Sequence, residues 1–88
     1  MSENKGEGRA RMIYGILQRQ GFKCALSGVD LDPDSASLDH IIPVSKGGSY
    51  DSADNLQIVT REINRMKGAL MNDEFVDLCR TVYKNAKP

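Results

Sequence analysis

The chain has 88 residues, of which 40% are hydrophobic and 27% charged, and its formal net charge is zero. This length leaves room for one small domain with a thin core, and the composition excludes a disordered tail. A net charge of zero does not indicate a polyanionic partner. The charges are unevenly distributed, however: basic residues dominate up to residue 23 and acidic residues dominate from 24 to 59. Such an arrangement permits a basic face beside an acidic pocket.

The N-terminal segment is polar and lacks the apolar region of a secretory signal, and no apolar run is long enough to span a bilayer. We therefore expect an intracellular, cytoplasmic protein without a membrane partner. The two cysteines, Cys24 and Cys79, are too few for a disulfide framework and form no Cys-x-x-Cys pair. Both are expected to be free thiols, with Cys79 in the core.

Apolar residues recur at helical spacing over about residues 8–20 and predict an amphipathic N-terminal helix that ends near Gly21. Short irregular strands are expected next, followed by a better strand over about residues 37–44. Pro43 and the following Lys-Gly-Gly turn would close that strand. The alternating sequence NLQIV, residues 55–59, predicts a second strand.

Two further helices are expected after this strand. Thr60 can cap the first, which would run to about Leu70, and Asn72 can cap the last, over about residues 73–84. The order α-β-β-α-α predicts an α+β fold in a single domain over residues 1–88. The helical side chains expected to face the core are Ile13, Ile16, Leu17, Ile63, Met66, Leu70, Phe75, Leu78, Cys79 and Val82.

A group of polar residues occupies the middle of this order: Asp39 and His40, then Asn55, then Asn64. A hairpin followed directly by a helix can bring the first pair against the helix that carries Asn64. Carboxylate and amide oxygens are hard ligands suited to Mg²⁺ or Mn²⁺. An imidazole, with an unperturbed pKa of about 6.5, can take a proton from water near neutral pH. Neighbouring strand residues point to opposite faces, so Asp39 and His40 could flank one phosphate.

Each of these residues has an ordinary structural explanation when taken alone, as a strand-end histidine, a turn asparagine or an exposed helical asparagine. Their joint spacing favours phosphodiester hydrolysis, in which a base activates water and a metal stabilises the leaving group. A calcium loop starting at Asp30 is excluded, because its sixth position is Ser35 instead of glycine and its twelfth is Ile41 instead of glutamate.

The stretch LDHIIPVSKGGSYDSADNLQIVTREINRMKG, residues 38–68, closely resembles the core of the HNH endonucleases, which have the ββα-metal fold. The resemblance implies such a core over about residues 22–70, flanked by the N-terminal and C-terminal helices. The residues that carry it are Asp39, His40, Ile41, Ile42, Pro43, Ser45, Lys46, Gly47, Gly48, Asp54, Asn55, Leu56, Asn64, Lys67 and Gly68.

Site roles follow from this resemblance. It implies that His40 is the general base, that Asp39 and Asn64 bind one divalent metal ion, and that Asn55 serves the catalytic site by holding the loop between the strands in shape. Position 64 is Asn where the family name expects its last His, so the chain looks like the H-N-N variant, which also occurs in the nuclease domain of RNA-guided CRISPR enzymes. The amide oxygen shifts the metal preference toward Mg²⁺ and away from Zn²⁺.

Many members of the family frame the hairpin with two Cys-x-x-Cys pairs that hold zinc. The matching positions here contain a single thiol, so no structural zinc is expected. Packing of the flanking helices would replace its stabilising role. The matching positions are Cys24, Ser27, Thr60 and Ile63.

A phosphodiester substrate brings negative charge that local cations would meet. Such contacts bind phosphates and confer little sequence preference, so specificity would come from a homodimer, a partner protein or an unusual DNA structure. The candidates for phosphate contact are Lys46, Arg61, Arg65 and Lys67, with Arg9, Arg11 and Arg19 as an extension.

The expected protein is thus a Mg²⁺- or Mn²⁺-dependent endonuclease that acts on DNA, with double-stranded DNA as the expected form and RNA left open. One active site per chain would nick one strand. The alternative is a non-catalytic nucleic-acid-binding or assembly module that retains the fold. A third interpretation, a structural metal-binding domain, lacks the soft ligands that it would need.

Overall fold

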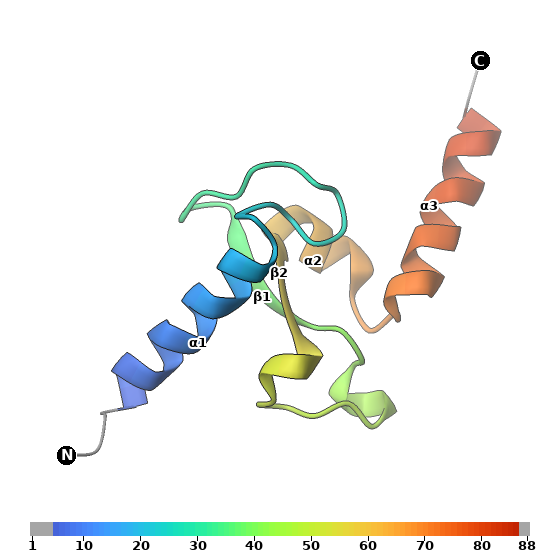
Figure 1. Ribbon diagram of the computed structural model, residues 1–88. Coiled ribbons are helices and arrows are strands. Elements are labelled where there is room, and N and C mark those ends of the chain that lie inside the picture. The colour runs from blue at the N-terminus through green and yellow to red at the C-terminus, as the bar shows by residue number, and fades with distance from the viewer. Residues whose placement is uncertain (1–4, 87–88) are drawn as a thin grey trace.

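A computed structural model describes residues 5–86 of the chain (Figure 1). The fold is α+β, as predicted, and a two-stranded antiparallel hairpin lies at its centre. In chain order the elements are helix α1 (Lys5–Arg19), strand β1 (Ala36–His40), the 3₁₀ turns η1 (Val44–Lys46) and η2 (Ala53–Asn55), strand β2 (Leu56–Thr60), helix α2 (Arg61–Lys67) and helix α3 (Asn72–Ala86).

Most element boundaries fall close to the predicted ones. Helix α1 begins three residues before its predicted start, and α3 extends beyond both of its predicted ends. Strand β1 stops at His40, four residues short of the prediction. Helix α2 stops at Lys67, because Gly68 has a positive φ of 54° and donates its N–H to the Asn64 carbonyl as a C-cap.

The register of the hairpin decides which side chains share a face. Leu38 pairs with Ile58, Asp39 with Gln57, and His40 with Leu56. Since paired residues point to the same side of a sheet and neighbours to opposite sides, Leu38 and His40 lie on one face while Asp39 lies on the other. The two residues predicted to flank a phosphate are therefore separated by the thickness of one strand.

The hydrophobic core lies between α1 and the hairpin. Ile16, Leu56 and Ile58 are almost fully buried there. The packing of α1 against the sheet agrees with the predicted inward face of this helix. Six partly buried apolar side chains complete the cluster: Met12, Ile13, Leu17, Leu31, Ala36 and Leu38.

Helix α3 projects away from the rest of the molecule (Figure 1). The radius of gyration is 14.6 Å, compared with about 12 Å for a compact domain of this length. Only Phe75, in the first turn of α3, is buried, whereas Leu78 and Val82 are 51% and 59% exposed and Cys79 is exposed as well. The predicted core positions at these last three residues are wrong, because the helix leaves the core after one turn.

Two more side chains differ from the predicted core. Met66 on α2 is 59% exposed instead of facing inward. Cys24 is the buried thiol, and its sulfur accepts a hydrogen bond from the backbone N–H of Ser27 at 3.4 Å. Both cysteines are free, as predicted. No helix within the described range has the length and apolar character needed to cross a membrane.

Candidate active site

The loop after β1 is held by the side chain of Asn55. Its Oδ1 accepts the backbone N–H of Ile42 at 2.8 Å, and its Nδ2 donates to the carbonyl oxygens of Ile42 at 2.9 Å and Ser49 at 2.8 Å. These bonds tie the backbone of Ile42, just past the end of β1, to that of Ser49 in the loop. Asn55 is thus a positioning residue that acts on the loop backbone.

Gly48 lies against this clamp. A Cβ atom at Gly48 would overlap the carbonyl oxygen of Ile42 and lie 2.7 Å from Nδ2 of Asn55. We expect Gly48→Ala to lower the free energy of unfolding by about 1–3 kcal/mol, because the backbone of the loop must move to admit the methyl group. Urea denaturation followed by circular dichroism would measure this change.

Gly15 supplies the matched control. It lies within α1, and a Cβ there would meet nothing within 4 Å. Gly15→Ala is expected to stabilise the protein by about 0.5–1 kcal/mol through helix propensity. Equal effects of the two substitutions would contradict the packing described at Gly48.

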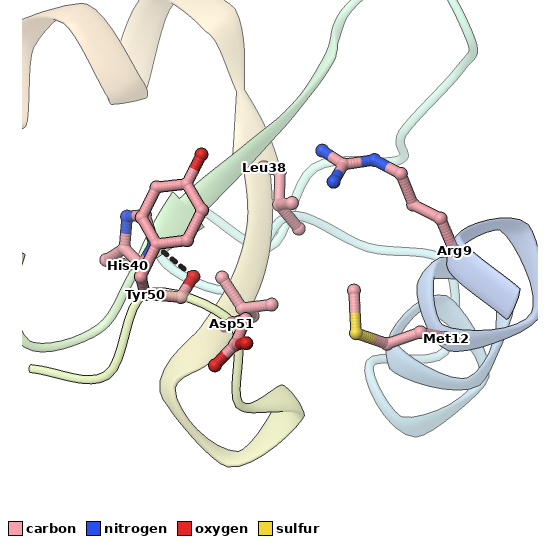
Figure 2. Close-up of a pocket in the computed structure, with 7 residues that line it drawn as sticks. Arg9, Met12, Leu38, His40, Tyr50 and Asp51 are labelled. Atoms are coloured by element: carbon pink, nitrogen blue, oxygen red, sulfur yellow. Dashed lines mark hydrogen bonds between the residues drawn. The ribbon is translucent and has the colours of Figure 1, made fainter. Parts of the chain in front are cut away.

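His40 is oriented by a backbone carbonyl from this loop. Its Nε2 lies 2.8 Å from the carbonyl oxygen of Tyr50, and the tilted Tyr50 ring lies with its centroid 5.5 Å from that of the imidazole (Figure 2). A carbonyl oxygen can only accept a hydrogen bond, so Nε2 is the donor and the neutral ring has its lone pair on Nδ1. This tautomer presents a basic nitrogen.

On the other face of the hairpin, Asp39 is buried beside a buried lysine. The carboxylate Oδ2 accepts a hydrogen bond from Nε2 of Gln57 at 2.9 Å and lies 3.0 Å from Nζ of Lys67. Lys67 is 1% exposed and Asp39 7% exposed. The ammonium group also donates to the carbonyl oxygen of His40 at 3.0 Å. Lys67 therefore ties the Asp39 side chain to the backbone of the predicted base.

The network continues to the start of α3. Gln57 and Asn72 exchange two side-chain hydrogen bonds, of 2.9 and 3.1 Å. No buried side-chain nitrogen or oxygen within residues 5–86 lacks a partner. Sequence reasoning missed Gln57, which reads as an ordinary strand residue, and assigned Asn72 only a capping role. The pairing of Gln57 with Asp39 could have been expected only from the hairpin register.

Asn64 lies on the same face of the hairpin as Asp39. Its Nδ2 donates to Oγ of Ser37 at 2.7 Å and to the carbonyl oxygen of Leu38 at 3.3 Å. These bonds hold the amide against β1 and leave Oδ1 of Asn64 without a hydrogen bond from the described residues. Oδ1 of Asp39 is likewise without one, since its partners bind Oδ2.

The predicted metal ligands, Asp39 and Asn64, each keep one oxygen that can bind a cation. In Asp39 the other carboxylate oxygen is engaged, and in Asn64 the amide nitrogen is anchored by hydrogen bonds. Hard oxygen donors suit Mg²⁺ or Mn²⁺, and Mg²⁺ needs only one or two protein ligands because waters and substrate phosphate complete its shell. In the part of the chain that the structure describes, no three His, Cys, Asp or Glu side chains converge on a metal position.

The predicted phosphate contacts fall into different environments. Arg61 and Arg65 are exposed and line an open hollow together with Asn64. Lys46 is partly exposed and forms an ion pair of 2.9 Å with Glu74. The burial of Lys67 is at odds with the expected surface contact to phosphate, because its ammonium is enclosed beside Asp39.

The carboxylate of Glu74 is also a helix cap. It accepts the backbone N–H of Met71 at 2.8 Å, which is the main cause of its lowered pKa, and Lys46 lowers that pKa further. A carboxylate in this position stabilises the first turn of α3. Lys46 thus links the glycine loop to the start of α3. Arg19 is also engaged, since its Nη2 donates to the carbonyl oxygen of Leu56 at 3.0 Å.

An antiparallel hairpin followed at once by a helix, with a histidine on one face and an aspartate and an asparagine on the other, defines a ββα nuclease core. The sequence model of the HNH endonuclease family matches residues 24–71, more than half of the chain. The protein therefore belongs to the HNH endonuclease family, as its resemblance predicted.

The chain is also similar to part of a much larger nuclease. Over 55 residues it is 34% identical to the CRISPR-associated endonuclease Cas9 of Corynebacterium diphtheriae. The alignment covers 62% of this chain and 5% of that protein. The similarity thus concerns one nuclease core and extends to a small fraction of the relative's length.

Proposed function

We propose that this protein is a metal-dependent endonuclease that hydrolyses phosphodiester bonds in DNA. The observation that carries the proposal is the fixed tautomer of His40 at the end of β1, with the oxygens of Asp39 and Asn64 on the opposite face. A base and a hard-ligand pair separated by one strand can serve two sides of one phosphate.

His40 would activate the attacking water. Nδ1 accepts a proton from the water while Nε2 continues to donate to the Tyr50 carbonyl, which also stabilises the imidazolium that forms. The bond from Lys67 to the carbonyl oxygen of His40 and the Asn55 clamp keep the strand end and the loop in one geometry. These residues position the base without taking part in proton transfer.

Asp39 and Asn64 would hold one Mg²⁺ or Mn²⁺ ion. When bound, the ion supplies positive charge that stabilises the leaving oxygen. Gln57 and Lys67 keep Oδ2 of Asp39 engaged, so the side chain is already oriented with Oδ1 available. Pre-orientation of this kind reduces the entropy lost when ligand and substrate assemble.

The substrate backbone would be bound by exposed arginines. Arg61 and Arg65 border the hollow beside Asn64, and a guanidinium group can form two parallel hydrogen bonds with a phosphate. Such contacts give affinity that falls with salt concentration and carry no base information. Each chain contains one such site, so a single encounter would nick one strand.

Conversion of supercoiled plasmid to the nicked form tests this proposal in parallel reactions with EDTA, Mg²⁺, Mn²⁺ and Zn²⁺. We expect nicking with Mg²⁺ or Mn²⁺ and none with EDTA. Asn64→Ala should require a higher concentration of the metal ion, because one of its two protein ligands is lost. Arg80→Ala, which removes an exposed ion pair with Asp77 on α3, should behave as the unaltered protein does.

Loss of the Asn64 bond to Ser37 could also disturb the fold, so circular dichroism should accompany the assay. Nicking in EDTA would contradict the role of a metal. If the protein binds DNA but stays inert with every ion, the non-catalytic binding module becomes the better interpretation.

A further inference from the structure

A recess adjoins His40 (Figure 2). It lies on the face of the hairpin opposite Asp39, because Leu38 and His40 share one face and Asp39 points to the other. It has a volume of about 230 Å³, below the roughly 300–1,000 Å³ typical of pockets for drug-sized ligands. Met12 from α1, with Leu38 and Leu56 from the hairpin, gives it apolar walls. Its size suits a small group with some apolar surface.

Polar and aromatic groups surround the opening of this recess. Figure 2 shows Arg9 reaching from α1 toward Leu38, with Tyr50 and Asp51 on the side of the loop. Arg9 forms no hydrogen bond or ion pair with residues 5–86, and Asp51 has one long contact, 3.5 Å from Oγ of Ser49. The Tyr50 side chain is 74% exposed. The recess thus offers a guanidinium, a carboxylate and an aromatic ring around an apolar interior.

We propose that this recess binds one unpaired nucleobase of the substrate strand, from a nucleotide next to the scissile phosphate. The inference rests on the proposed function and names its substrate class. A phosphate attacked by water at His40 must lie beside His40, which is itself part of the wall of the recess. The nucleoside attached to that phosphate therefore reaches the opening.

The base must be unpaired to enter. In a duplex both of its faces are stacked and its edge is hydrogen-bonded, so a recess bounded by α1 and the loop admits it only after it leaves the stack. The cost of this step is smallest for a base that is already bulged, mismatched or single-stranded. The preferred substrate is consequently DNA with an unpaired nucleotide at the cleavage position.

The opening can also bind the edge of the base. Arg9 can only donate hydrogen bonds and the Asp51 carboxylate can only accept them. Each of the four bases, once unpaired, presents both donor and acceptor groups on its edge, so these two side chains can bind any of them. Tyr50 provides a stacking surface that accepts any base. The recess therefore recognises the unpaired state of the nucleotide and not its identity.

Fluorescence anisotropy in EDTA tests the recess without any requirement for cleavage. The probes are labelled hairpin oligonucleotides that differ only in one position, either fully paired or carrying one bulged guanine, cytosine or thymine. We expect all three bulged probes to bind about tenfold more tightly than the paired probe, as stacking of one base allows. Arg9→Ala and Tyr50→Ala should each reduce this preference, and Tyr50→Phe should keep it.

Arg11→Ala is the matched control, since it removes an exposed arginine of the same helix that does not line the recess. It should lower the affinity for the paired and the bulged probes by the same factor. Equal affinity for all probes, or a preference for the bulge that survives both Arg9→Ala and Tyr50→Ala, would overturn the proposal.

The same probes incubated with Mg²⁺ or Mn²⁺ separate the recess from the nuclease. Tighter binding of the bulged probes without cleavage under any condition would leave the recess in place and refute the proposed function. Cleavage at equal rates beside paired and bulged positions would support the nuclease and refute the recess as a base-binding site.

Discussion

Replacement of His40 by alanine is expected to slow plasmid nicking by about 10²–10⁴-fold while DNA binding is retained, because the substitution removes the proposed general base. The expectation follows from the hydrogen bond between Nε2 and the Tyr50 carbonyl, which leaves Nδ1 as the basic atom. Initial rates of nicking at saturating metal, together with binding measured by anisotropy, would check both parts of this result.

Rescue by added imidazole is the control that distinguishes loss of a base from a structural defect in this variant. If His40 acts as a base, free imidazole in the buffer should restore part of the activity of His40→Ala in proportion to its unprotonated concentration. A merely misfolded variant would not respond. Full activity in the variant without imidazole would contradict the assignment of His40.

The second large effect is expected on stability. Lys67→Met should lower the free energy of unfolding by about 3–5 kcal/mol, because the Asp39 carboxylate would remain buried without its cation. A domain of this size has a total stability of only about 5–15 kcal/mol, so the variant is expected to melt far below the unaltered protein. Urea denaturation monitored by circular dichroism would measure the change.

Two comparisons make this prediction specific to the buried pair. Lys46→Met breaks the more exposed ion pair with Glu74 and should have a much smaller effect on the free energy of unfolding, because solvent screens this pair. In the double variant Lys67→Met with Asp39→Asn, no unpaired carboxylate remains, so part of the lost stability should return. A Lys67→Met variant as stable as Lys46→Met would show that the burial of Lys67 has no energetic importance.

The order of elements and the packing of α1 could be predicted because both depend on local patterns. Ile13, Ile16 and Leu17 recur at helical spacing, and the alternating residues of β2 read directly as a strand. The end of β1 was harder to predict. The strand stops at His40 because the backbone N–H of Asn55 bonds to Ser52 in the loop instead of to Ile41 across the hairpin.

The outer part of α3 could not be placed from its sequence. The spacing of Leu78 and Val82 defines one apolar face, but periodicity does not tell which surface that face meets. Here it leaves the core after Phe75 and stays exposed. The error therefore lies in the assumption that every apolar stripe of a small domain packs on the same core.

Within the site, the least predictable residue was Lys67. Charged side chains are rarely buried unless they are paired, and a lysine next to a helix-ending glycine reads as a surface cation. Its partners, Asp39 and the carbonyl of His40, lie on a strand distant in sequence. Only the packing of α2 against β1 reveals that the ammonium is enclosed beside Asp39 and the His40 carbonyl.

The enclosed ammonium of Lys67 also bears on how the proposed metal site would fill. Since the buried Asp39 carboxylate already has a positively charged neighbour in the protein itself, it would not depend on a divalent ion for its neutralisation. The same charge repels an arriving divalent cation and so weakens its association. If the protein is the metal-dependent nuclease proposed above, its core would stay folded when ions are depleted, and its turnover would follow the free ion concentration.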